Sequence, residues 1–170
     1  MIFFDLFSNK STAPLWQNKP VLVAAAAAVR QTTPPESLPD NTILIEWQRL
    51  VEDNKTCPRC GDTGSEIDKA EALLNRVFEP LDCLVKVRKK ELSMETFQKN
   101  PASSNHILID GKLLELWLGA DTGMSPCCDV CGDAECRTID LNGTEFETIP
   151  ARLIILACLE AYIQKEKLKC

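Results

Sequence analysis

The sequence predicts an α/β protein in which a small mixed sheet is flanked by helices. Segments with an apolar period of two alternate along the chain with segments of helical period, which is the pattern of this class. The expected order is strand, helix, strand, helix, strand, hairpin and helix. In addition, a chain of 170 residues with 45% hydrophobic and 26% charged residues has the composition of a globular domain with its own core.

Residues 1–41 differ in composition from the rest of the chain. They contain five prolines and few charges, and the last prolines indicate a stiff linker. The apolar run over 20–29 is about ten residues long, whereas a membrane-spanning helix needs about 20, so we expect no stable span. We therefore expect an N-terminal extension over 1–41, either disordered or weakly helical or with a targeting segment in 1–30, and one domain over 42–170.

The domain is expected to begin with a buried strand and an amphipathic helix. Residues 42–51 are rich in β-branched and aromatic residues, which indicates a mostly buried strand. Apolar residues at helical spacing predict a helix over about 65–80. Thr63 and Glu66 have the spacing of a capping box at the start of this helix. On this interpretation the helix begins several residues after Cys60.

The remaining segments predict alternating strands and helices. Over 83–90, apolar residues alternate with Lys and Arg, which indicates a half-buried strand with a solvated basic face. Asn142-Gly143 is the strongest hairpin signal in the chain. The other ranges are a short helix from Ser93 to just before Pro101, a strand over 106–109 with an Asp110-Gly111 turn, a helix or returning strand over 113–118, hairpin strands over 137–141 and 145–149, and a final helix from Pro150 to about Lys167.

Six of the nine cysteines lie in two short polar segments punctuated by glycine. Thiols at CxxC spacing either chelate soft metals or cycle between dithiol and disulfide. The hydrophobic core looks large enough to stabilise the fold without disulfide bonds. This clustering therefore favours metal or redox use in a reducing compartment inside the cell. An organellar or exported protein is expected instead if residues 1–30 are a targeting segment. The six are Cys57 and Cys60 of CPRCG, and Cys127, Cys128, Cys131 and Cys136 of CCDVCGDAEC.

Metal binding is the favoured use of these thiols. Two residues between thiolates let both reach one tetrahedral ion, and the following glycine lets backbone N–H groups turn toward sulfur. Carboxylates near the cysteines attract a cation and disfavour an uncoordinated thiolate. These carboxylates are Asp62, Asp129, Asp133 and Glu135, against Arg59 and Arg137. We expect one soft metal ion, zinc first, held by Cys57, Cys60, Cys128 and Cys131, with Cys127 and Cys136 as the next candidates.

A single site requires the fold to bring two distant segments together. The motifs are separated by far more than the about 15–20 residues of a compact zinc ribbon. In the alternative, Cys127 or Cys128 forms a separate site with Cys131 and Cys136. An iron–sulfur cluster could use the same ligands, although the spacing matches neither ferredoxin pattern well.

The element order, with CPRC in its first loop, resembles the thioredoxin-like architecture, which implies a small mixed sheet with helices on both faces. More closely, residues from about 42 to 162 resemble a family of uncharacterised cysteine-rich domains, a domain-of-unknown-function family. The shared stretches are a CPRCGDTG-type loop at 57–64, an I-D/N-G-K-x-L-E-x-W-L-G stretch at 109–119 and a CCDVCGDAEC-type loop at 127–136. This resemblance implies a fold and a set of thiols.

The thioredoxin-like resemblance also implies an alternative function, that of a thiol–disulfide oxidoreductase without a cofactor. Cys57 would attack a substrate disulfide, Cys60 would resolve the mixed disulfide, and the CCxxC loop would be a second relay. Two features depart from that pattern: the predicted helix start lies beyond Cys60, and Ser104-Asn105 stand where a cis-proline is usual. A disulfide-linked structural domain, which would need an exported chain, is the third hypothesis.

Several other functions are excluded or disfavoured by composition. A net charge of −6 argues against a nucleic-acid partner. The cysteine segments indicate a metal ion or protein thiols as the expected partners. With His106 as the single histidine, His-rich zinc hydrolase sites are excluded. There is no glycine-rich phosphate loop and no serine-hydrolase elbow. Cys83 and Cys158 lie on apolar faces and are expected in the core. Cys170 is a terminal thiol, and His106 is expected to serve packing.

Overall fold

Two sheets organise the part of the chain that the computed structural model describes, residues 38–127 and 131–169. In the larger sheet the order is β2-β1-β3-β4; β1 runs parallel to β2 and antiparallel to β3, and β3 pairs antiparallel with β4. The smaller sheet is antiparallel, with β6 between β5 and β7. The strands are β1 (Thr42–Leu50), β2 (Leu84–Leu92), β3 (His106–Ile109), β4 (Lys112–Leu113), β5 (Asp121–Pro126), β6 (Glu135–Leu141) and β7 (Thr144–Phe146).

The described residues confirm the predicted mixed α/β class. Their α-helices are α1 (Pro58–Phe78), α2 (Met94–Lys99), α3 (Leu114–Leu118) and α4 (Ala151–Lys169), with short 3-10 turns at Glu79–Leu81 and Pro101–Ser103. Most elements match their predicted ranges, and residues 112–118 form both a short strand and a helix. The predictions for residues 1–37, including the targeting segment, lie outside the described residues.

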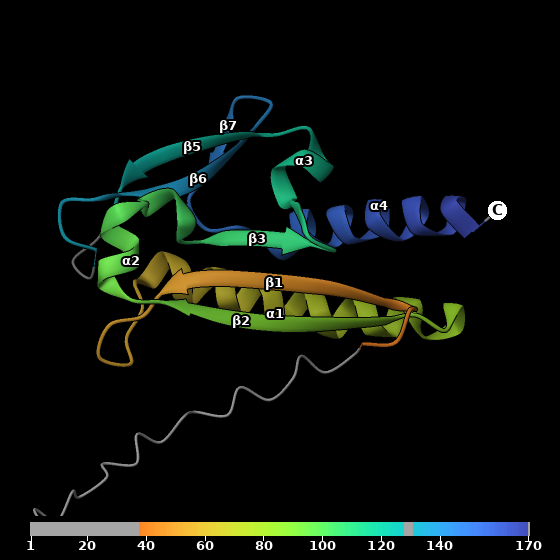
Figure 1. Ribbon diagram of the computed structural model, residues 1–170. Coiled ribbons are helices and arrows are strands. Elements are labelled where there is room, and N and C mark those ends of the chain that lie inside the picture. The colour runs from red at the N-terminus through yellow and green to blue at the C-terminus, as the bar shows by residue number, and fades with distance from the viewer. Residues whose placement is uncertain (1–37, 128–130, 170) are drawn as a thin grey trace, which may run out of the picture. The chain divides into compact units, whose positions relative to one another are not determined.

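Both long helices, α1 and α4, pack against each other and against one face of the larger sheet (Figure 1). Ile43, Ile45 and Trp47 point into this layer and are buried. The expectation of helices on both faces is therefore wrong for the two long helices. On the opposite face Glu46 pairs with Arg88 at 3.1 Å and Lys90 at 2.7 Å, so the predicted basic face of β2 is solvated and charge-paired.

Helix α1 begins at the CPRC motif, and this corrects the predicted start near residue 65. Pro58 is the first helical residue, where its missing N–H costs nothing, and Cys57 is the extended N-cap. The predicted start was too late because Thr63 and Glu66 were interpreted as the capping box of this helix. Gly64 lies inside the helix for a packing reason: a Cβ there would lie 2.7 Å from a ring carbon of Trp47.

The predicted capping box of α1 caps another helix. Thr63 lies inside α1, fully buried, and its hydroxyl accepts a hydrogen bond from the N–H of Ile149 at 3.1 Å. Glu66 accepts one from the N–H of Ala151, the first residue of α4, at 2.8 Å. One turn apart on α1, the two side chains thus satisfy free N–H groups at the start of α4.

We expect Thr63→Val to lower the free energy of unfolding by about 1–3 kcal/mol, because the isosteric change leaves the buried N–H of Ile149 without its acceptor. Urea unfolding at a fixed metal content measures this. Glu66→Gln keeps an acceptor oxygen and is the matched control, with an expected change below about 0.5 kcal/mol. An unchanged unfolding midpoint for Thr63→Val would contradict the capping role.

Cys83 and Cys158 are buried in the core, as predicted. Burial, followed by the negative charge of Asp110, raises the pKa of Cys158 from 9.0 to about 12. The folded state therefore holds this proton more tightly than the unfolded chain does. The stability that Cys158 contributes is complete below about pH 9 and is lost as the pH rises toward about 12.

We expect this loss to appear as a steeper alkaline destabilisation of the wild type than of Cys158→Ala. Guanidinium unfolding of both proteins at several pH values between about 8 and 11 measures the two slopes. The smaller alanine side chain changes the free energy of unfolding of the variant by the same amount at every pH. The comparison therefore uses the slopes of the free energy of unfolding against pH. Parallel pH profiles would show that the Cys158 thiol does not titrate in this way.

Candidate metal centre

The two cysteine segments meet at one end of the sheets. Strands β1 and β5 both end, and β6 begins, at the left-hand side of Figure 1. Helix α1 follows β1 with a short connection, so CPRC lies at this end of the sheets together with Cys127 and Cys131. The sulfur atoms of Cys57, Cys127 and Cys131 lie within 4.8 Å of one another. The sulfur of Cys136 lies 3.5 Å from that of Cys131.

Cys57 is held at the N-terminus of α1. Its backbone is extended, with φ −67° and ψ 155°, and its sulfur accepts a hydrogen bond from the N–H of Cys60 at 3.4 Å. Its carbonyl accepts another from Gly61 at 2.9 Å. The positive end of a helix dipole favours negative charge at this position. The sequence-based prediction of a helix start beyond Cys60 is therefore wrong: Cys57 lies at the N-cap, where the helix dipole acts on its sulfur.

The second segment is closed by the ladder between β5 and β6. In this ladder Ser125 pairs with Cys136, and beyond it the N–H of Cys127 donates to the carbonyl of Ala134 at 3.1 Å. Gly132 supplies a positive φ of 62° for the turn. These constraints place Cys127, Cys131 and Cys136 on the side that faces CPRC. Cys128, which the sequence favoured over Cys127 as a ligand, lies outside the described residues.

Arg59 joins the two cysteine segments. Its Nη1 donates to the carbonyl of Pro126, the residue before Cys127, at 3.1 Å, and lies 3.8 Å from a carboxylate oxygen of Glu147. Its Nε and Nη2 are buried and have no hydrogen-bond partner within the described part of the chain. Sequence reasoning counted Arg59 only as a nearby charge. A basic residue inside a CxxC motif was the available signal for this contact.

Cys60 lies behind Cys57, toward the core. Its sulfur is 3.8 Å from the hydroxyl oxygen of Ser104, which also accepts a hydrogen bond from the N–H of Leu50 at 3.1 Å. Asn105 follows with a positive φ of 53°, and its side-chain oxygen accepts from the indole N–H of Trp47 at 3.3 Å. Ser104 and Asn105 thus occupy the position opposite CPRC where a cis-proline was expected for a thioredoxin-like oxidoreductase.

The cluster disfavours uncompensated thiolates. A hydrogen bond with Cys57, followed by burial, raises the pKa of Cys60 well above its usual range. Burial, followed by contacts with Cys127 and Cys136, raises the pKa of Cys131 as well. Burial, followed by contact with Cys127, raises the pKa of Cys136 to about 12. At neutral pH these thiols keep their protons unless a cation replaces them.

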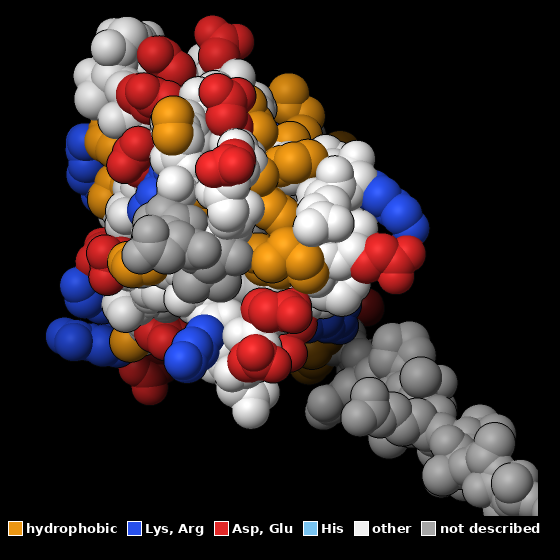
Figure 2. All heavy atoms as spheres, turned by 90° about the vertical axis from the view of Figure 1, so that its left-hand side faces the viewer, with side chains coloured by type: hydrophobic (Ala, Val, Ile, Leu, Met, Phe, Trp, Pro, Cys, Tyr) orange, Lys and Arg blue, Asp and Glu red, His pale blue; other side chains and the backbone are white. Residues whose placement is uncertain are grey.

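The neighbouring carboxylates contribute less to the raised pKa values of the cluster thiols than the sequence suggested. Asp62, Asp133 and Glu135 are exposed, and the raised thiol pKa values come from burial and from the other thiols. Figure 2, which views the end of the molecule at the left-hand side of Figure 1, shows acidic side chains spread over this surface. Arg137 pairs with Glu115 at 2.8 Å in a buried contact between β6 and α3.

The sulfur separations suit a single metal ion. Four thiolates about 2.3 Å from a tetrahedral zinc ion are about 3.8 Å apart. The 3.5 Å separation of the Cys131 and Cys136 sulfurs is close to this value, and the sulfurs of Cys57, Cys127 and Cys131 are no more than 4.8 Å apart. The cysteine cluster is therefore near enough to bind a metal. His106 is half-buried at the start of β3, and burial, followed by the charge of Arg137, lowers its pKa.

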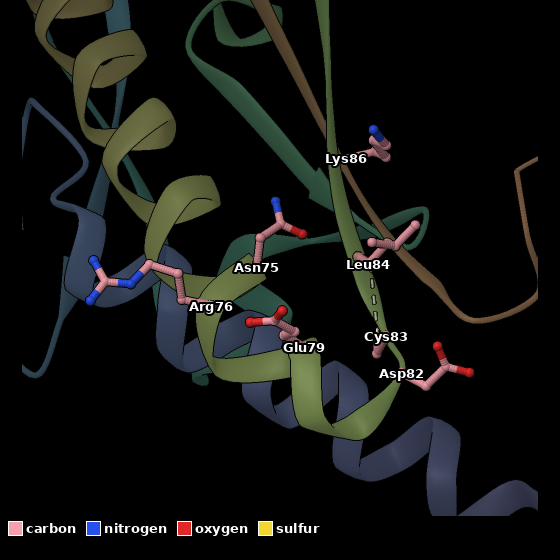
Figure 3. A pocket seen from close by; sticks show the side chains of 7 residues that line it. All are labelled: Asn75, Arg76, Glu79, Asp82, Cys83, Leu84 and Lys86. Carbon is pink, nitrogen blue, oxygen red and sulfur yellow. Dashed lines mark hydrogen bonds between the residues drawn. The ribbon is translucent and has the colours of Figure 1, made fainter.

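A separate cavity of about 430 Å³ lies at the other end of α1 (Figure 3). Asn75 projects beside it, and its side-chain amide pairs with both the N–H and the carbonyl of Val85. These bonds cover part of the open edge of β2, which explains why a polar residue is placed there. The lining residues, of mixed charge, are Asn75, Arg76, Glu79, Asp82, Cys83, Leu84 and Lys86.

None of the helices in the described residues has the length and apolar character of a membrane span.

The fold and the cluster together define a cysteine-rich α/β domain in which thiols from two loops meet at the start of the first helix. Comparison with protein families gives a match over residues 43–158 to a domain of unknown function, DUF2703, and the chain belongs to this family.

One curated relative is an uncharacterised protein of Archaeoglobus fulgidus. It is 42% identical over 112 residues, which cover 66% of this chain and 82% of the relative. No solved structure matches the chain. The family predicted from the cysteine loops is thus confirmed, whereas the thioredoxin-like part of that resemblance stays a prediction.

Proposed function

We propose that the cysteine cluster binds one soft metal ion, zinc first, and that the protein is a metal-binding or metal-handling module. The observation that carries this proposal is the convergence of Cys57, Cys127 and Cys131 from two distant segments to within 4.8 Å. Packing alone gives no reason to gather so many thiols at one point. A shared cation does, because it replaces the thiol protons and compensates the charge of the thiolates.

The proposed ligands are Cys57, Cys127, Cys131 and Cys136. Cys136 completes the set because its sulfur lies 3.5 Å from that of Cys131 and contacts Cys127. This set replaces Cys60 and Cys128 of the sequence-based hypothesis with Cys127 and Cys136. Cys60 contacts Cys57 and Ser104 instead.

The surroundings supply positive charge for such a site. Zinc with four thiolates carries a net charge of −2, which needs compensation in a buried position. The N-terminus of α1 and the hydrogen bond from the Cys60 N–H lie at Cys57. Arg59, two residues after Cys57, adds buried Nε and Nη2 groups that have no hydrogen-bond partner among the described residues and can interact with the same charge.

Mass spectrometry under native and denaturing conditions, combined with a count of reactive thiols, tests the proposal. Protein purified in reducing buffer is expected to carry one zinc ion per chain and no disulfide. A protein that takes up no zinc from a buffered zinc solution, or that holds fixed bridges, would contradict it. Repeating the measurement with cobalt gives the thiolate-to-metal absorption that reports sulfur ligation.

We expect Arg59→Met to weaken zinc binding by about tenfold. Methionine keeps an unbranched side chain but removes both the contact with the Pro126 carbonyl and the positive charge. A chelator competition titration measures the change. Glu147→Gln is the control: this carboxylate lies 3.8 Å from Arg59 and its side chain is 55% exposed, so its loss should change little. Equal affinities of Arg59→Met and the wild type would remove Arg59 from the site.

A thiol–disulfide oxidoreductase is the second candidate, and one observation favours it. Cys57 is the N-cap of a long helix, which is where a nucleophilic thiolate is stabilised, and Cys60 lies beside it as a resolving thiol. Its substrates would be protein disulfides, and it would need no cofactor. Insulin reduction that is lost in Cys57→Ser would support this function, and no reduction by the metal-free wild type would exclude it.

A further inference from the structure

We infer that Cys127 is the thiol at which an external disulfide reacts, and that electrons then pass from the Cys57 and Cys60 pair through Cys127 to that disulfide, releasing any metal held by the cluster. This inference joins the two candidate functions in one set of thiols. Its metal-releasing part rests on the proposed metal site. Its electron-transfer part is independent of that site and can be tested on metal-free protein.

Exposure identifies the reacting thiol. Cys57, Cys60, Cys131 and Cys136 are buried, with exposed fractions of 1%, 1%, 6% and 2%. Cys127 alone among the described cluster cysteines is only partly buried. Among the described cluster cysteines, Cys127 is therefore the one that a disulfide in solution reaches most readily, whereas Cys57 is buried and needs a rearrangement. Cys57, the expected nucleophile of a thioredoxin-like enzyme, therefore acts second.

The sulfur contacts form a path from the surface to the core. Cys127 lies within 4.8 Å of Cys57, and Cys57 in turn contacts Cys60. Cys60 is outside the proposed ligand set and rests against the Ser104 hydroxyl at 3.8 Å. Cys60 therefore keeps its thiol when the other cluster cysteines hold the metal, and this thiol can then form a disulfide with Cys57. The CxxC spacing at a helix start suits closure with Cys57.

The proposed reaction consists of three exchanges. The Cys127 sulfur attacks the disulfide RSSR, forms a mixed disulfide and expels the first thiolate. Cys57 attacks the Cys127 sulfur, forms a Cys57–Cys127 disulfide and expels the second thiolate. Cys60 then attacks the Cys57 sulfur and expels Cys127 as a thiolate. Two electrons leave the Cys57 and Cys60 pair, RSSR becomes two RSH, and Cys127 returns to its initial state; the protons come from the oxidised thiols or, when metal is bound, from water.

Metal release follows from the shared position of Cys57. A sulfur in a disulfide is no longer a thiolate and is a poor zinc ligand. Oxidation of Cys57 therefore leaves three of the four proposed ligands, and zinc dissociates to a competing chelator. Reduction of the Cys57–Cys60 disulfide restores the site.

The test uses oxidised glutathione as the disulfide and the full chain, reduced and metal-free, under anaerobic conditions. We expect Cys127→Ser to form reduced glutathione at least about tenfold more slowly than the wild type, because its remaining described cluster thiols are buried. Cys83→Ala, which changes a cysteine outside the cluster, should react at the wild-type rate. A wild-type rate for Cys127→Ser, or no reaction of the wild type, would overturn the inference.

Peptide mapping distinguishes this path from direct attack by Cys57. Trypsin cleaves after Arg59, between the two CPRC cysteines, so a Cys57–Cys60 disulfide joins peptides 56–59 and 60–69. We expect this product in the wild type. In Cys60→Ser the reaction should stop at the Cys57–Cys127 disulfide, which joins peptides 56–59 and 113–137. A Cys131–Cys136 disulfide as the main wild-type product would contradict the path.

Zinc-loaded protein tests the coupling. We expect about one zinc ion to appear in a chromogenic chelator for each disulfide consumed. Wild type that binds no zinc would overturn the proposed metal site and the coupling, but not the electron path. Wild type that binds zinc and keeps it while the Cys57–Cys60 disulfide forms would overturn the coupling alone.

Discussion

Cys57→Ser is expected to abolish tight zinc binding, with a loss of affinity greater than about 100-fold. Changes in residues that merely support a metal ligand typically cost about 10–100-fold, and the loss of a ligand should cost more. Cys57 has a central position because its sulfur is close to those of Cys127 and Cys131 and lies at the start of α1. Chelator competition followed by mass spectrometry measures the affinity.

Serine at a cysteine outside the cluster is the matched control for this substitution. Cys83 is buried near the other end of α1, so Cys83→Ser should keep wild-type zinc affinity even if it lowers stability. Far-ultraviolet circular dichroism of Cys57→Ser then shows whether the fold survives. Cys57→Ser that is folded and binds zinc as tightly as the wild type would remove Cys57 from the site.

Removal of zinc is expected to lower the melting temperature by roughly 8–16 °C. A ligand present at about 1,000 times its dissociation constant stabilises the folded state by about 4 kcal/mol. For a domain of this size, 1 kcal/mol corresponds to roughly 2–4 °C. The zinc would also tie the β5–β6 segment to the start of α1, two elements that otherwise meet through Arg59. Differential scanning calorimetry with and without a chelator measures the shift.

Cys57→Ser separates zinc removal from other effects of the chelator. Its melting temperature should be the same with and without the chelator, because it holds no zinc to lose. Re-addition of zinc should restore the wild-type value and leave the variant unchanged. An equal chelator effect on both proteins would show that the stabilisation comes from a different source.

Local patterns predicted most of the secondary structure because each of these patterns acts over a few residues. The alternation in β1 and β2 places Ile43 and Val85 in the core, and the Asn142-Gly143 turn adopts two positive φ values, 54° and 78°, that fit a tight hairpin. The start of α1 was missed for a long-range reason. Thr63 and Glu66 were interpreted as the capping box of this helix, whereas the helix extends back to Pro58 and includes Gly64, where Trp47 of the adjacent strand leaves no room for a Cβ.

From the sequence, Thr63 and Glu66 were recognised as capping residues but assigned to the wrong helix. A capping box and a pair of acceptors for a distant helix have the same sequence pattern. Only the packing of α1 against α4 brings the N–H groups of Ile149 and Ala151 to these side chains.

The sequence by itself indicated the kind of chemistry to expect, because thiols at CxxC spacing in a chain with its own core suit a soft metal or a disulfide. It also determined the family, through the two cysteine loops. The tertiary structure decided which sulfurs are neighbours: pairing of β5 with β6 carries Cys127 and Cys131 to Cys57 and leaves Cys60 against Ser104. Contacts between segments so far apart depend on strand pairing and helix packing across the whole domain, and no local spacing encodes them.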